Sequence, residues 1–466
     1  MRFPTIPPDT SAIREGLNSD IAMRLIGLGP SLPDGRYLHW DELRYREPPE
    51  GLTREQWWFG VRMSRRRAAQ TVASLMETYG RPFSFVPLPR IQQALHQLDR
   101  MDIGQEILSA LGDREAKREY RVRQLIEEAI SSSEIEGARP STREQAQKML
   151  REARKPTTRD EHMILNNLRA MQRLRELHED QQELTVDHLL ELHRILGQGA
   201  LEIPGAEGQF RGVEHNVIVE DVEGNVWYRP PPAEGLRERV EQLLSFANDT
   251  TNETKLFIHP IVRAIITHFW LGYEHPFRDG NGRIARALFY WCMLRHDYEV
   301  AEFLSISGPI ERSPNAYYLA FAYTETDGED LTYFVLHQLG VLQAAHKELI
   351  EHLHRRAARL KALATRISTF AELNHRQRSV LEHAIRRPNE GQTIEGHQNS
   401  HAVHYMTARA DLNDLVARGL LTERRVATQK RFHPSEMLFV EDKQPTSRTA
   451  AKLGSRPRSR KRISKR

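Results

Sequence analysis

The spacing of hydrophobic residues predicts helices over most of the chain. From Thr53 onward, apolar positions recur at helical spacing and can face a core, namely Trp57, Trp58, Val61, Ala68, Val72 and Leu75. Further helical stretches are expected at about 90–111, 119–131, 141–154, 159–179 and 186–197. An apolar helix is also expected over 257–270. The pattern therefore predicts a mainly α-helical fold.

One short segment breaks the helical pattern. Val217, Ile218 and Val219, followed by a second apolar stretch that ends at Tyr228, predict two short strands around a Gly224-Asn225 turn. Three prolines at 230–232 end the segment. The sequence thus predicts one β-hairpin inserted between helices.

The second half of the chain predicts a long helix and then a compact module. Apolar residues recur from Val335 to Ile367, as one long amphipathic helix or as two helices with a break near Gly340. The spacing is too irregular for a coiled coil, so this helix is compatible with a connector or with the seam of a homodimer. Residues 374–434 combine helices, a Gly419-Leu-Leu segment and a basic hairpin, an order that resembles a winged helix-turn-helix domain.

Composition and charge refine this picture. Cys292 is the only cysteine, which excludes an intrachain disulfide. The sequence has no run of about 18 apolar residues and no apolar segment typical of a signal peptide, so we expect a cytoplasmic protein without a membrane span. Residues 441–466 carry ten Lys and Arg against two acidic residues, a balance of +8 within a total of +4. The basic character therefore belongs to the tail, which we expect to be disordered and able to neutralise phosphates.

Candidate chemistry concentrates in residues 275–286. Gly280 and Gly282 flank Asn281, so the backbone can form a tight turn whose N–H groups converge on an anion. An apolar run with Arg283 and Arg286 spaced i, i+3 follows, which predicts a helix whose N-terminus points at the same anion.

Two further side chains complete the candidate site. Asp279 offers hard oxygen ligands, which suit a Mg²⁺ ion carried by a nucleotide. His275 stands just ahead of the turn, where a neutral imidazole could take a proton from a hydroxyl group.

This stretch resembles the signature of Fic-domain proteins, His-x-Phe-x-(Asp/Glu)-Gly-Asn-Gly-Arg-x-x-Arg. All eight specified positions match, namely His275, Phe277, Asp279, Gly280, Asn281, Gly282, Arg283 and Arg286. The resemblance implies a helical core with one functional β-hairpin, and an enzyme that transfers AMP from ATP to a Ser, Thr or Tyr hydroxyl of a protein. Some relatives use other donors, and some remove AMP.

The resemblance also implies a role for each matched residue. His275 would be the catalytic base, and Asp279 would hold Mg²⁺. The amides of Gly280 and Gly282, together with Asn281, would hold phosphates. Arg283 would contact the β-phosphate, and Arg286 would contact the γ-phosphate. Phe277 would fix the loop by packing.

Two other segments resemble parts of the same family. Ser132-x-x-x-Glu136-Gly137 resembles the inhibitory motif (Ser/Thr)-x-x-x-Glu-(Gly/Asn), in which the glutamate would pair with Arg286 when the enzyme is off. Glu136 would also be available to position water for AMP removal. Gly208-Gln-Phe-Arg211 and the hairpin resemble the flap that binds a target segment through Val217, Ile218 and Val219. Arg211 is expected among the nucleotide-binding residues.

The expected domain organisation follows from these assignments. It comprises an N-terminal helical extension at 1–112, a Fic domain with its inhibitory helix at 113–345, a connecting helix at 346–373, a winged helix-turn-helix at 374–440 and a basic tail at 441–466. The expected partners are ATP, Mg²⁺ and a protein substrate that could be the chain itself. A DNA-binding transcriptional regulator with a Fic sensor core is the alternative, because winged helices read duplex DNA.

Overall fold

The structure is a computed structural model that describes residues 2–11, 13, 18–77, 80–100, 114–139, 143–151, 154–220, 224, 226–250, 257–369, 372–386, 391–426 and 429–438. It divides into two compact units, Met1–Leu353 and His354–Arg466. The predicted boundary at residue 112 falls inside the first unit, and the finer domain boundaries stay predictions. Two predictions concern residues outside the described ones. The predicted Gly224-Asn225 turn includes Asn225, and the predicted basic tail covers 441–466.

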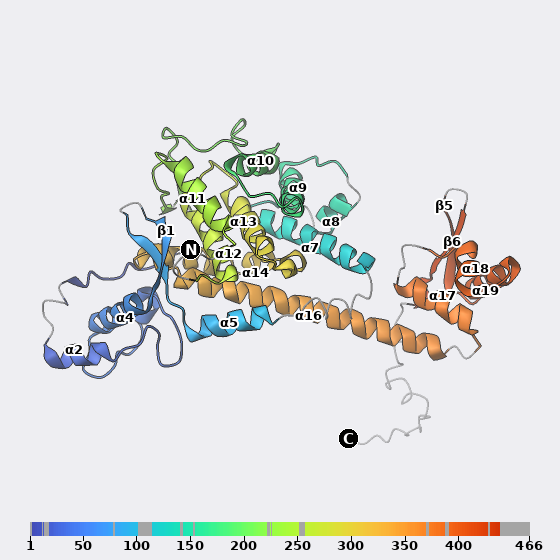
Figure 1. The fold of residues 1–466 in the computed structure, drawn as a ribbon, viewed down its shortest axis with the longest axis horizontal. Coiled ribbons are helices and arrows are strands. Elements are labelled where there is room, and N and C mark those ends of the chain that lie inside the picture. The colour runs from blue at the N-terminus through green and yellow to red at the C-terminus, as the bar shows by residue number, and fades with distance from the viewer. Residues whose placement is uncertain are drawn as a thin grey trace, which may run out of the picture. The chain divides into compact units, whose positions relative to one another are not determined.

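The described part of the first unit is mainly helical, as predicted (Figure 1). Its helices are α2 (Ser19–Ile26), α3 (Trp40–Leu43), α4 (Arg54–Ala68), α5 (Pro89–Asp99), α7 (Arg114–Ile135), α8 (Arg143–Arg151), α9 (Arg159–Glu179), α10 (Val186–Gly197), α11 (Leu236–Asn248), α12 (Pro260–Glu274), α13 (Asn281–Arg295), η1 (Glu299–Phe303), α14 (Ser307–Arg312), α15 (Pro314–Thr326) and α16 (Thr332–Thr369). Its strands are β1 (Gln70–Met76), β2 (Pro82–Phe85), β3 (Val219–Glu220) and β4 (Val226–Tyr228).

One prediction for the N-terminal extension is wrong. Val72 and Leu75 were expected on a helix, but both lie in β1, which pairs with β2 as an antiparallel hairpin. The pairing register shifts between Thr71 and Met76. From the pair Thr71–Ser84 to the pair Met76–Pro82, β1 advances five positions and β2 advances two, so the regular alternation is interrupted and two positions three apart can both face the core. Both side chains are fully buried. The spacing imitates a helix because the strand is bulged.

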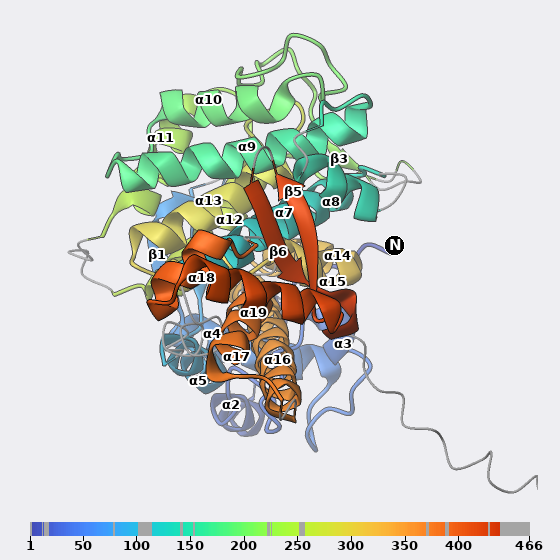
Figure 2. The same cartoon turned by 90° about the vertical axis from the view of Figure 1, so that its right-hand side faces the viewer.

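Two helices form the centre of the first unit. Helices α12 and α13 pack against each other and are enclosed by α7, α9 and α11 (Figures 1 and 2). Almost every residue of both helices is buried, which is expected of helices that are apolar on all sides. Cys292 lies in this core with no exposed area, and burial raises the pKa of its thiol to about 12.

The long helix predicted after residue 335 is continuous. Helix α16 passes through Gly340 without a break, and a Cβ added at that glycine would meet no heavy atom within 4 Å. Gly340 is therefore not needed for close packing or for a bend. The boundary between the two units falls within this helix.

The second unit contains three helices followed by an antiparallel hairpin. Its elements are α17 (His375–Arg386), α18 (Ile394–His401), α19 (Tyr405–Ala417), β5 (Leu421–Val426), β6 (Gln429–Pro434) and η2 (Glu436–Leu438). They enclose their own apolar core around Leu381, Leu412 and Phe432. This order of helices and hairpin is the one predicted for residues 374–434, and the assignment as a winged helix-turn-helix stays a prediction.

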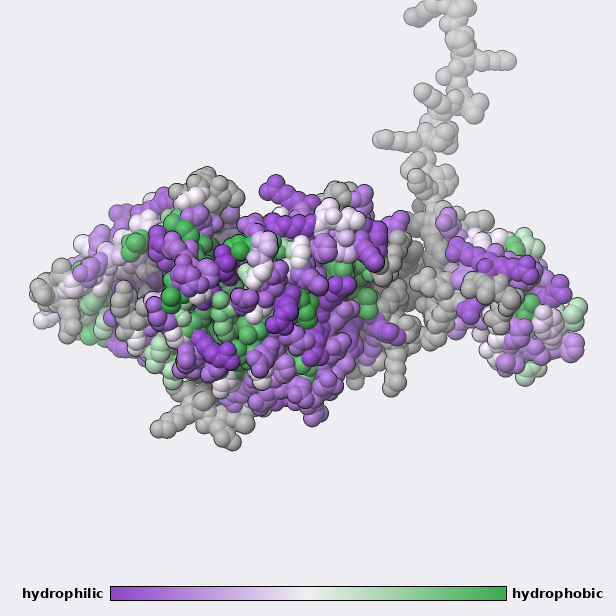
Figure 3. Space-filling model, turned by 90° about the horizontal axis from the view of Figure 1, so that it is seen from above, coloured by the Kyte–Doolittle hydropathy of each residue, from purple (hydrophilic) through white to green (hydrophobic). Residues whose placement is uncertain are grey.

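The molecular surface is mixed in character. Seen from above, hydrophobic residues form small groups among hydrophilic ones (Figure 3). Within the described ranges, every helix is too short or too polar to cross a lipid bilayer.

Candidate functional site

The predicted site is a loop between the two central helices. Helix α12 ends where His275 adopts a left-handed conformation, with φ of 46° and ψ of 56°. Helix α13 begins after Gly280, which has a φ of 84°. We call the segment from His275 to Gly280 the signature loop. Both ends of the loop thus reverse the chain with left-handed residues, and this holds the loop against the N-terminus of α13.

Asn281 closes the signature loop with its side chain. Its Oδ1 accepts from the amide of Phe277 at 2.9 Å, and its Nδ2 donates to the Phe277 carbonyl at 2.8 Å. The side chain of Asn281 therefore bonds the loop itself. A direct contact between Asn281 and a phosphate stays a prediction, while the observed bonds fix the loop shape.

His275 has the hydrogen-bond pattern of a general base. Its Nδ1 lies 3.2 Å from the carbonyl oxygen of Gly272. Since a carbonyl oxygen only accepts, Nδ1 carries the proton of the neutral ring and Nε2 keeps a free lone pair. Burial lowers the pKa of His275 below its ordinary value, which favours the neutral ring at neutral pH. The geometry and the charge state both suit proton abstraction at Nε2.

Arg283 and Arg286 make the helix end strongly positive. Each residue is 1% exposed. Among the described contacts, Nε and Nη2 of Arg283 and Nη1 of Arg286 are buried without a hydrogen-bond partner. Leaving buried guanidinium nitrogens without partners is costly, so the charge and the free N–H groups of this region suit an anion. The dipole of α13 acts in the same direction.

Asp279 is held loosely at the edge of this region. Its carboxylate lies 3.6 Å from Nη2 of Arg283 and 3.9 Å from Nη2 of Arg159, and its side chain is 27% exposed. The amide of Glu202 approaches Oδ2 at 3.4 Å. These long contacts leave lone pairs of the carboxylate available for a cation.

The predicted inhibitory residues meet the signature at Arg286. Helix α7 ends at Ile135, and Glu136 follows with Oε1 2.8 Å from Nη2 of Arg286. Gly137 turns the chain away with a φ of 91°. A Cβ added at Gly282 would lie 2.1 Å from Oε1 of Glu136. The carboxylate therefore lies directly against the first turn of α13, where an anion is favoured.

Ser132 contacts Arg286 and not the glutamate. Its Oγ accepts from Nε of Arg286, and its carbonyl oxygen accepts from Nη2, both at 2.8 Å. Nη2 thus donates to both Ser132 and Glu136. Arg286 and Glu136 therefore share one hydrogen bond, not the two parallel bonds that a guanidinium can form with a carboxylate. The spacing that selects Ser132 from three consecutive serines does place it at Arg286.

Arg211 lies beside the signature loop but bonds the protein backbone. Its guanidinium donates to the carbonyls of His275, Pro231 and Glu274, the first at 2.9 Å through Nε. Its own amide donates to Pro276 at 2.9 Å. These contacts give Arg211 a role in holding the loop and the flap together, and nucleotide binding by Arg211 stays a prediction.

The predicted flap is a short hairpin. Val219 pairs with Tyr228 in the β3–β4 ladder, and Val217 and Ile218 lie just ahead of β3. All three predicted valine and isoleucine positions are partly exposed. Tyr228 donates its hydroxyl to the carbonyl of Tyr273 at 2.8 Å, which ties the hairpin to the end of α12. The flap therefore stands next to the signature loop.

One residue of the site is not predicted by any sequence pattern. His193 of α10 stacks on Phe277 with ring centroids 3.7 Å apart and planes 9° apart. Its Nε2 lies 2.9 Å from the carbonyl oxygen of Asp279. Burial lowers the pKa of His193 to about 4. Nothing in the sequence places it there, because it precedes the loop by more than 80 residues and resembles any histidine of an amphipathic helix.

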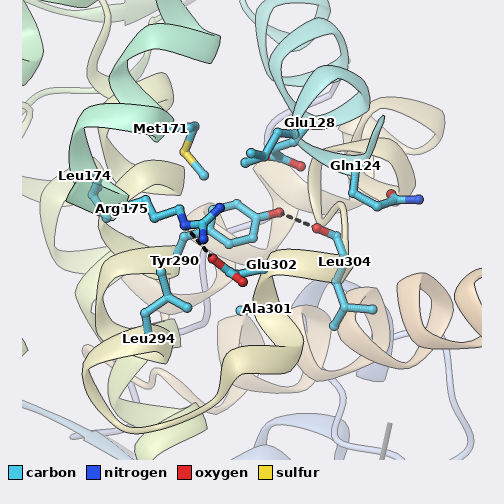
Figure 4. A pocket seen from close by; sticks show the side chains of 11 residues that line it. Gln124, Glu128, Met171, Leu174, Arg175, Tyr290, Leu294, Ala301, Glu302 and Leu304 are labelled. Atoms are coloured by element: carbon cyan, nitrogen blue, oxygen red, sulfur yellow. Dashed lines mark hydrogen bonds and ion pairs between the residues drawn. The ribbon is translucent and has the colours of Figure 1, made fainter. Parts of the chain in front are cut away.

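A small cavity lies elsewhere in the first unit, away from the signature loop. It measures about 20 Å³, room for one water molecule, and the side chains of α7, α9, α13 and η1 line it (Figure 4). Tyr290 and the ion pair of Arg175 with Glu302 border it. Nearby, Glu128 of α7 accepts from the Ser305 hydroxyl at 2.8 Å and the Ser307 amide at 3.0 Å. This part of the structure anchors the helix that carries Glu136.

Sequence comparison locates the same site. Residues 183–293 match the Fic/DOC family. This segment is a Fic/DOC domain. It contains α10, the flap, α11, α12 and the signature loop with most of α13. The Fic domain thus includes the predicted base, the anion-binding region and His193, whereas the inhibitory residues of α7 precede the matched segment.

Named relatives carry the same domain. The chain is 34% identical over 123 residues to protein adenylyltransferase fic-1 of Caenorhabditis elegans, and 33% identical over 115 residues to protein adenylyltransferase Fic of Nematostella vectensis. These matches cover 26% and 24% of this chain, and 22% and 24% of the relatives. The chain therefore spans less than a quarter of the length of these curated relatives. A solved structure of a Fic family protein from Desulfovibrio desulfuricans G20 covers 74% of this chain and 95% of its own, with 21% identity and a TM-score of 0.47.

Proposed function

We propose that the Fic domain transfers AMP from ATP to a hydroxyl group of a protein. The observation that carries this proposal is the neutral His275 with a free Nε2, next to the buried Arg283 and Arg286, some of whose guanidinium nitrogens have no hydrogen-bond partner among the described contacts. Two curated relatives of this domain are named protein adenylyltransferases. A base beside an anion-binding helix end is what a nucleotidyl transfer requires.

The proposed reaction consists of one proton transfer and one substitution at the α-phosphorus. Nε2 of His275 removes the proton of the target hydroxyl, and the oxygen forms a bond to the α-phosphorus. The bond between the α-phosphorus and the bridging oxygen breaks, and pyrophosphate leaves. Arg283, Arg286 and the first amides of α13 stabilise the negative charge that develops on the phosphates.

Mg²⁺ fits this site as a partner of the nucleotide. In the described ranges no group of three or more His, Cys, Asp and Glu side chains is placed to hold a metal. Mg²⁺ is commonly bound by one or two carboxylates plus substrate phosphates, and Asp279 is one partly exposed carboxylate. Asp279 would hold the ion, which when bound neutralises charge on the leaving phosphates.

We further propose that Glu136 keeps the enzyme off. Its carboxylate bonds Arg286 and lies against Gly282, so a γ-phosphate at Arg286 would meet a like charge. A misplacement of reacting groups by about 1 Å can lower a rate by about 10²-fold, so removing the carboxylate should raise transfer by a comparable factor. Positioning of water for AMP removal is a further use for the same carboxylate.

A labelling experiment tests the proposal. The wild-type protein and Glu136→Gly are incubated with ATP labelled at the α-phosphate and with Mg²⁺ in a cell lysate, and labelled proteins are identified by mass spectrometry. We expect labelled bands, the chain itself included among the candidates, with stronger labelling by Glu136→Gly. With the purified protein alone, ATP labelled at the γ-phosphate should leave no mark on the chain, since that phosphate departs with pyrophosphate.

Glu134→Gly is the matched control. Glu134 lies two residues earlier, in the last turn of α7, but it pairs with Arg143 and not with Arg286. It should therefore not activate. Equal labelling by wild type and Glu136→Gly over a range of ATP concentrations would contradict autoinhibition. No transfer of the α-phosphate label by either protein would contradict the proposed reaction.

The flap is proposed to hold the target. Val217, Ile218 and Val219 are partly exposed beside the signature loop, and an extended segment of a protein can add to the hairpin edge as a strand. Such binding places a hydroxyl near Nε2 of His275 through main-chain bonds. Specificity for the target sequence would then come mainly from every second side chain of the added strand, because these side chains point to the same face.

DNA binding by the second unit is the second candidate function. The acidic residues of α19 are engaged by the rest of this unit: Asp411 accepts from Asn374 and Arg376, and Asp414 accepts from Gln377 and Arg418. The exposed positions of α19 carry no negative charge, namely Tyr405, Met406, Thr407, Arg409, Ala410, Asn413 and Ala417. A helix of this charge pattern suits the major groove.

The hairpin of the second unit carries basic residues on both of its faces. Arg424 pairs with Arg431 across the β5–β6 ladder on one face, and Arg425 pairs with Lys430 on the other. Lys430 also forms an ion pair with Glu423 at 2.7 Å. Such side chains suit phosphates of the DNA backbone. Fluorescence anisotropy of the full chain with a labelled duplex should show binding at ~50 mM salt that weakens steeply as salt rises. No binding to specific or random duplexes would leave this unit as a protein-binding module.

A further inference from the structure

We infer that His193 is a positioning residue of the Fic domain: it fixes the main chain of Asp279 and so orients the Mg²⁺-binding end of the signature loop. This inference rests on the proposed function. Its evidence is the pair of hydrogen bonds and the ring stack that His193 makes with three different parts of the site.

The hydrogen bonds of His193 define one tautomer. The amide of Gly208 donates to Nδ1 at 2.9 Å, so Nδ1 must be unprotonated. Nε2 then carries the proton and donates to the carbonyl oxygen of Asp279 at 2.9 Å. The ring accepts from the segment that leads into the flap and donates to the signature loop. It therefore connects the target-binding side of the site with the nucleotide-binding side.

The packing of the ring leaves little freedom for movement. His193 has no exposed area, and it stacks face to face on Phe277 while Phe210 packs against the same ring of Phe277 with centroids 5.4 Å apart. A Cβ added at Gly280 would lie 3.5 Å from Nε2 of His193. The imidazole thus packs against the tight turn from Asp279 to Gly280 at van der Waals distance.

Helix α10 provides a rigid base for this residue. A capping box of Thr185 and His188 closes its N-terminus. His193 lies on its buried side among Leu189, Leu192 and Leu196, which are all fully buried. Because the helix cannot rotate without exposing these leucines, the position of Nε2 is set by the core. Residues that support a metal ligand in this way commonly contribute 10–100-fold to metal affinity or activity.

The alternative is a histidine that only fills the core, and two variants separate the two roles. His193→Phe keeps an aromatic ring on Phe277 but removes both hydrogen bonds. His193→Gln loses the stack but retains an N–H donor within reach of the Asp279 carbonyl. A positioning role predicts that the donor matters for the metal, whereas a packing role predicts that the ring matters for stability.

The test is carried out on the full chain with Glu136→Gly as the parent. We expect His193→Phe to raise the Mg²⁺ concentration for half-maximal labelling by about 10–100-fold. His193→Gln should restore most of the Mg²⁺ dependence, even if its melting temperature is lower. The control is His96→Phe, the same substitution at an exposed histidine of α5, which should leave the Mg²⁺ dependence unchanged. An unchanged Mg²⁺ requirement in folded His193→Phe would overturn the inference.

A second measurement does not depend on activity. The ¹⁵N chemical shifts of the His193 ring in the resting protein should show a protonated Nε2 and an unprotonated Nδ1 that accepts a hydrogen bond. The opposite tautomer would overturn the inference even if the enzyme transfers AMP. If the parent labels nothing, the proposed function fails, and the tautomer together with protection of the Gly208 amide from exchange still decides the role of His193.

Discussion

Helices α13 and α19 both begin where a functional site is predicted, but their first turns have opposite surroundings. In α13, Asn281 is 2% exposed and Arg283 is 1% exposed, and the carboxylate of Glu136 lies against Gly282. In α19, Tyr405 is 38% exposed and Met406 is 60% exposed. The start of α13 is filled by an anion of the chain itself, while the start of α19 is open to solvent.

This difference shows how the chain can control one site and leave the other to a partner. A helix N-terminus favours anions in both cases. At α13 the anion is attached to α7, so any change that moves α7 changes access to the site. At α19 the exposed Tyr405 and Met406 leave the helix start accessible to a partner from outside the chain.

Removal of the base should have the largest effect. In the Glu136→Gly background, His275→Ala should lower AMP transfer by about 10²–10⁴-fold, since this is the usual contribution of a general base. Transfer is measured with ATP labelled at the α-phosphate, and ATP binding by calorimetry should be nearly unchanged. A loss below tenfold would mean that another group takes the proton.

Removal of the Arg286 guanidinium should not activate the enzyme. Arg286→Ala breaks the ion pair with Glu136 but also removes the contact for the γ-phosphate. In the wild-type background we expect no rise in labelling, and in the Glu136→Gly background a fall of about 10²–10³-fold, as for the loss of one preorganised donor. If Arg286→Ala alone labels as strongly as Glu136→Gly, Arg286 serves only the inhibition.

Changes in the second unit should alter DNA binding and spare labelling. The double variant Arg424→Ala and Arg425→Ala removes two exposed charges, so the slope of log affinity against log salt should become shallower by about 2. Anisotropy titrations at several salt concentrations measure this slope. Arg237→Ala, an exposed arginine of α11 in the first unit, is the control and should leave the slope unchanged.

Removal of one hydroxyl should have the smallest effect. Ser132→Ala deletes the bond from Nε of Arg286, while the Ser132 carbonyl and Glu136 still hold Nη2. A hydrogen bond to a charged group contributes about 1.5–3 kcal/mol, and two contacts remain, so labelling should rise by roughly tenfold or less. The control is Ser133→Ala, whose hydroxyl bonds only the carbonyl of Ala129 in its own helix. Activation by both variants would point to loosening of α7.

The sequence predicts which residues of the signature loop lie together, because these residues are close in the chain. Loop glycines, the base and the arginines lie within twelve consecutive residues, so their spacing alone places them together. The helical fold class is confirmed for the same reason, since period and length identify α9 and α10 with their observed bounds. The contact between Glu136 and Arg286 was expected only through the family resemblance.

Other features depend on contacts that the sequence does not encode locally. His193 reaches Asp279 across 86 positions, and an amphipathic helix offers no sign that one of its buried residues is polar for a reason. Val72 and Leu75 imitate helical spacing because β1 is bulged against β2. The bonds of Arg211 to the carbonyls of Pro231, Glu274 and His275 likewise join segments far apart in the sequence, while its predicted contact with the nucleotide stays a prediction. In each case a partner from a distant segment decides the role.

The isolation of Cys292 has a practical consequence for watching the enzyme switch on. Its thiol is fully buried in α13, and its high pKa keeps it protonated, so maleimide dyes should leave the native chain unlabelled. A cysteine introduced on the exposed side of α7 and another on α10 can then carry a donor and an acceptor dye without removal of any native residue. Energy transfer between them would report the distance between the inhibitory helix and the Fic domain in single molecules during turnover.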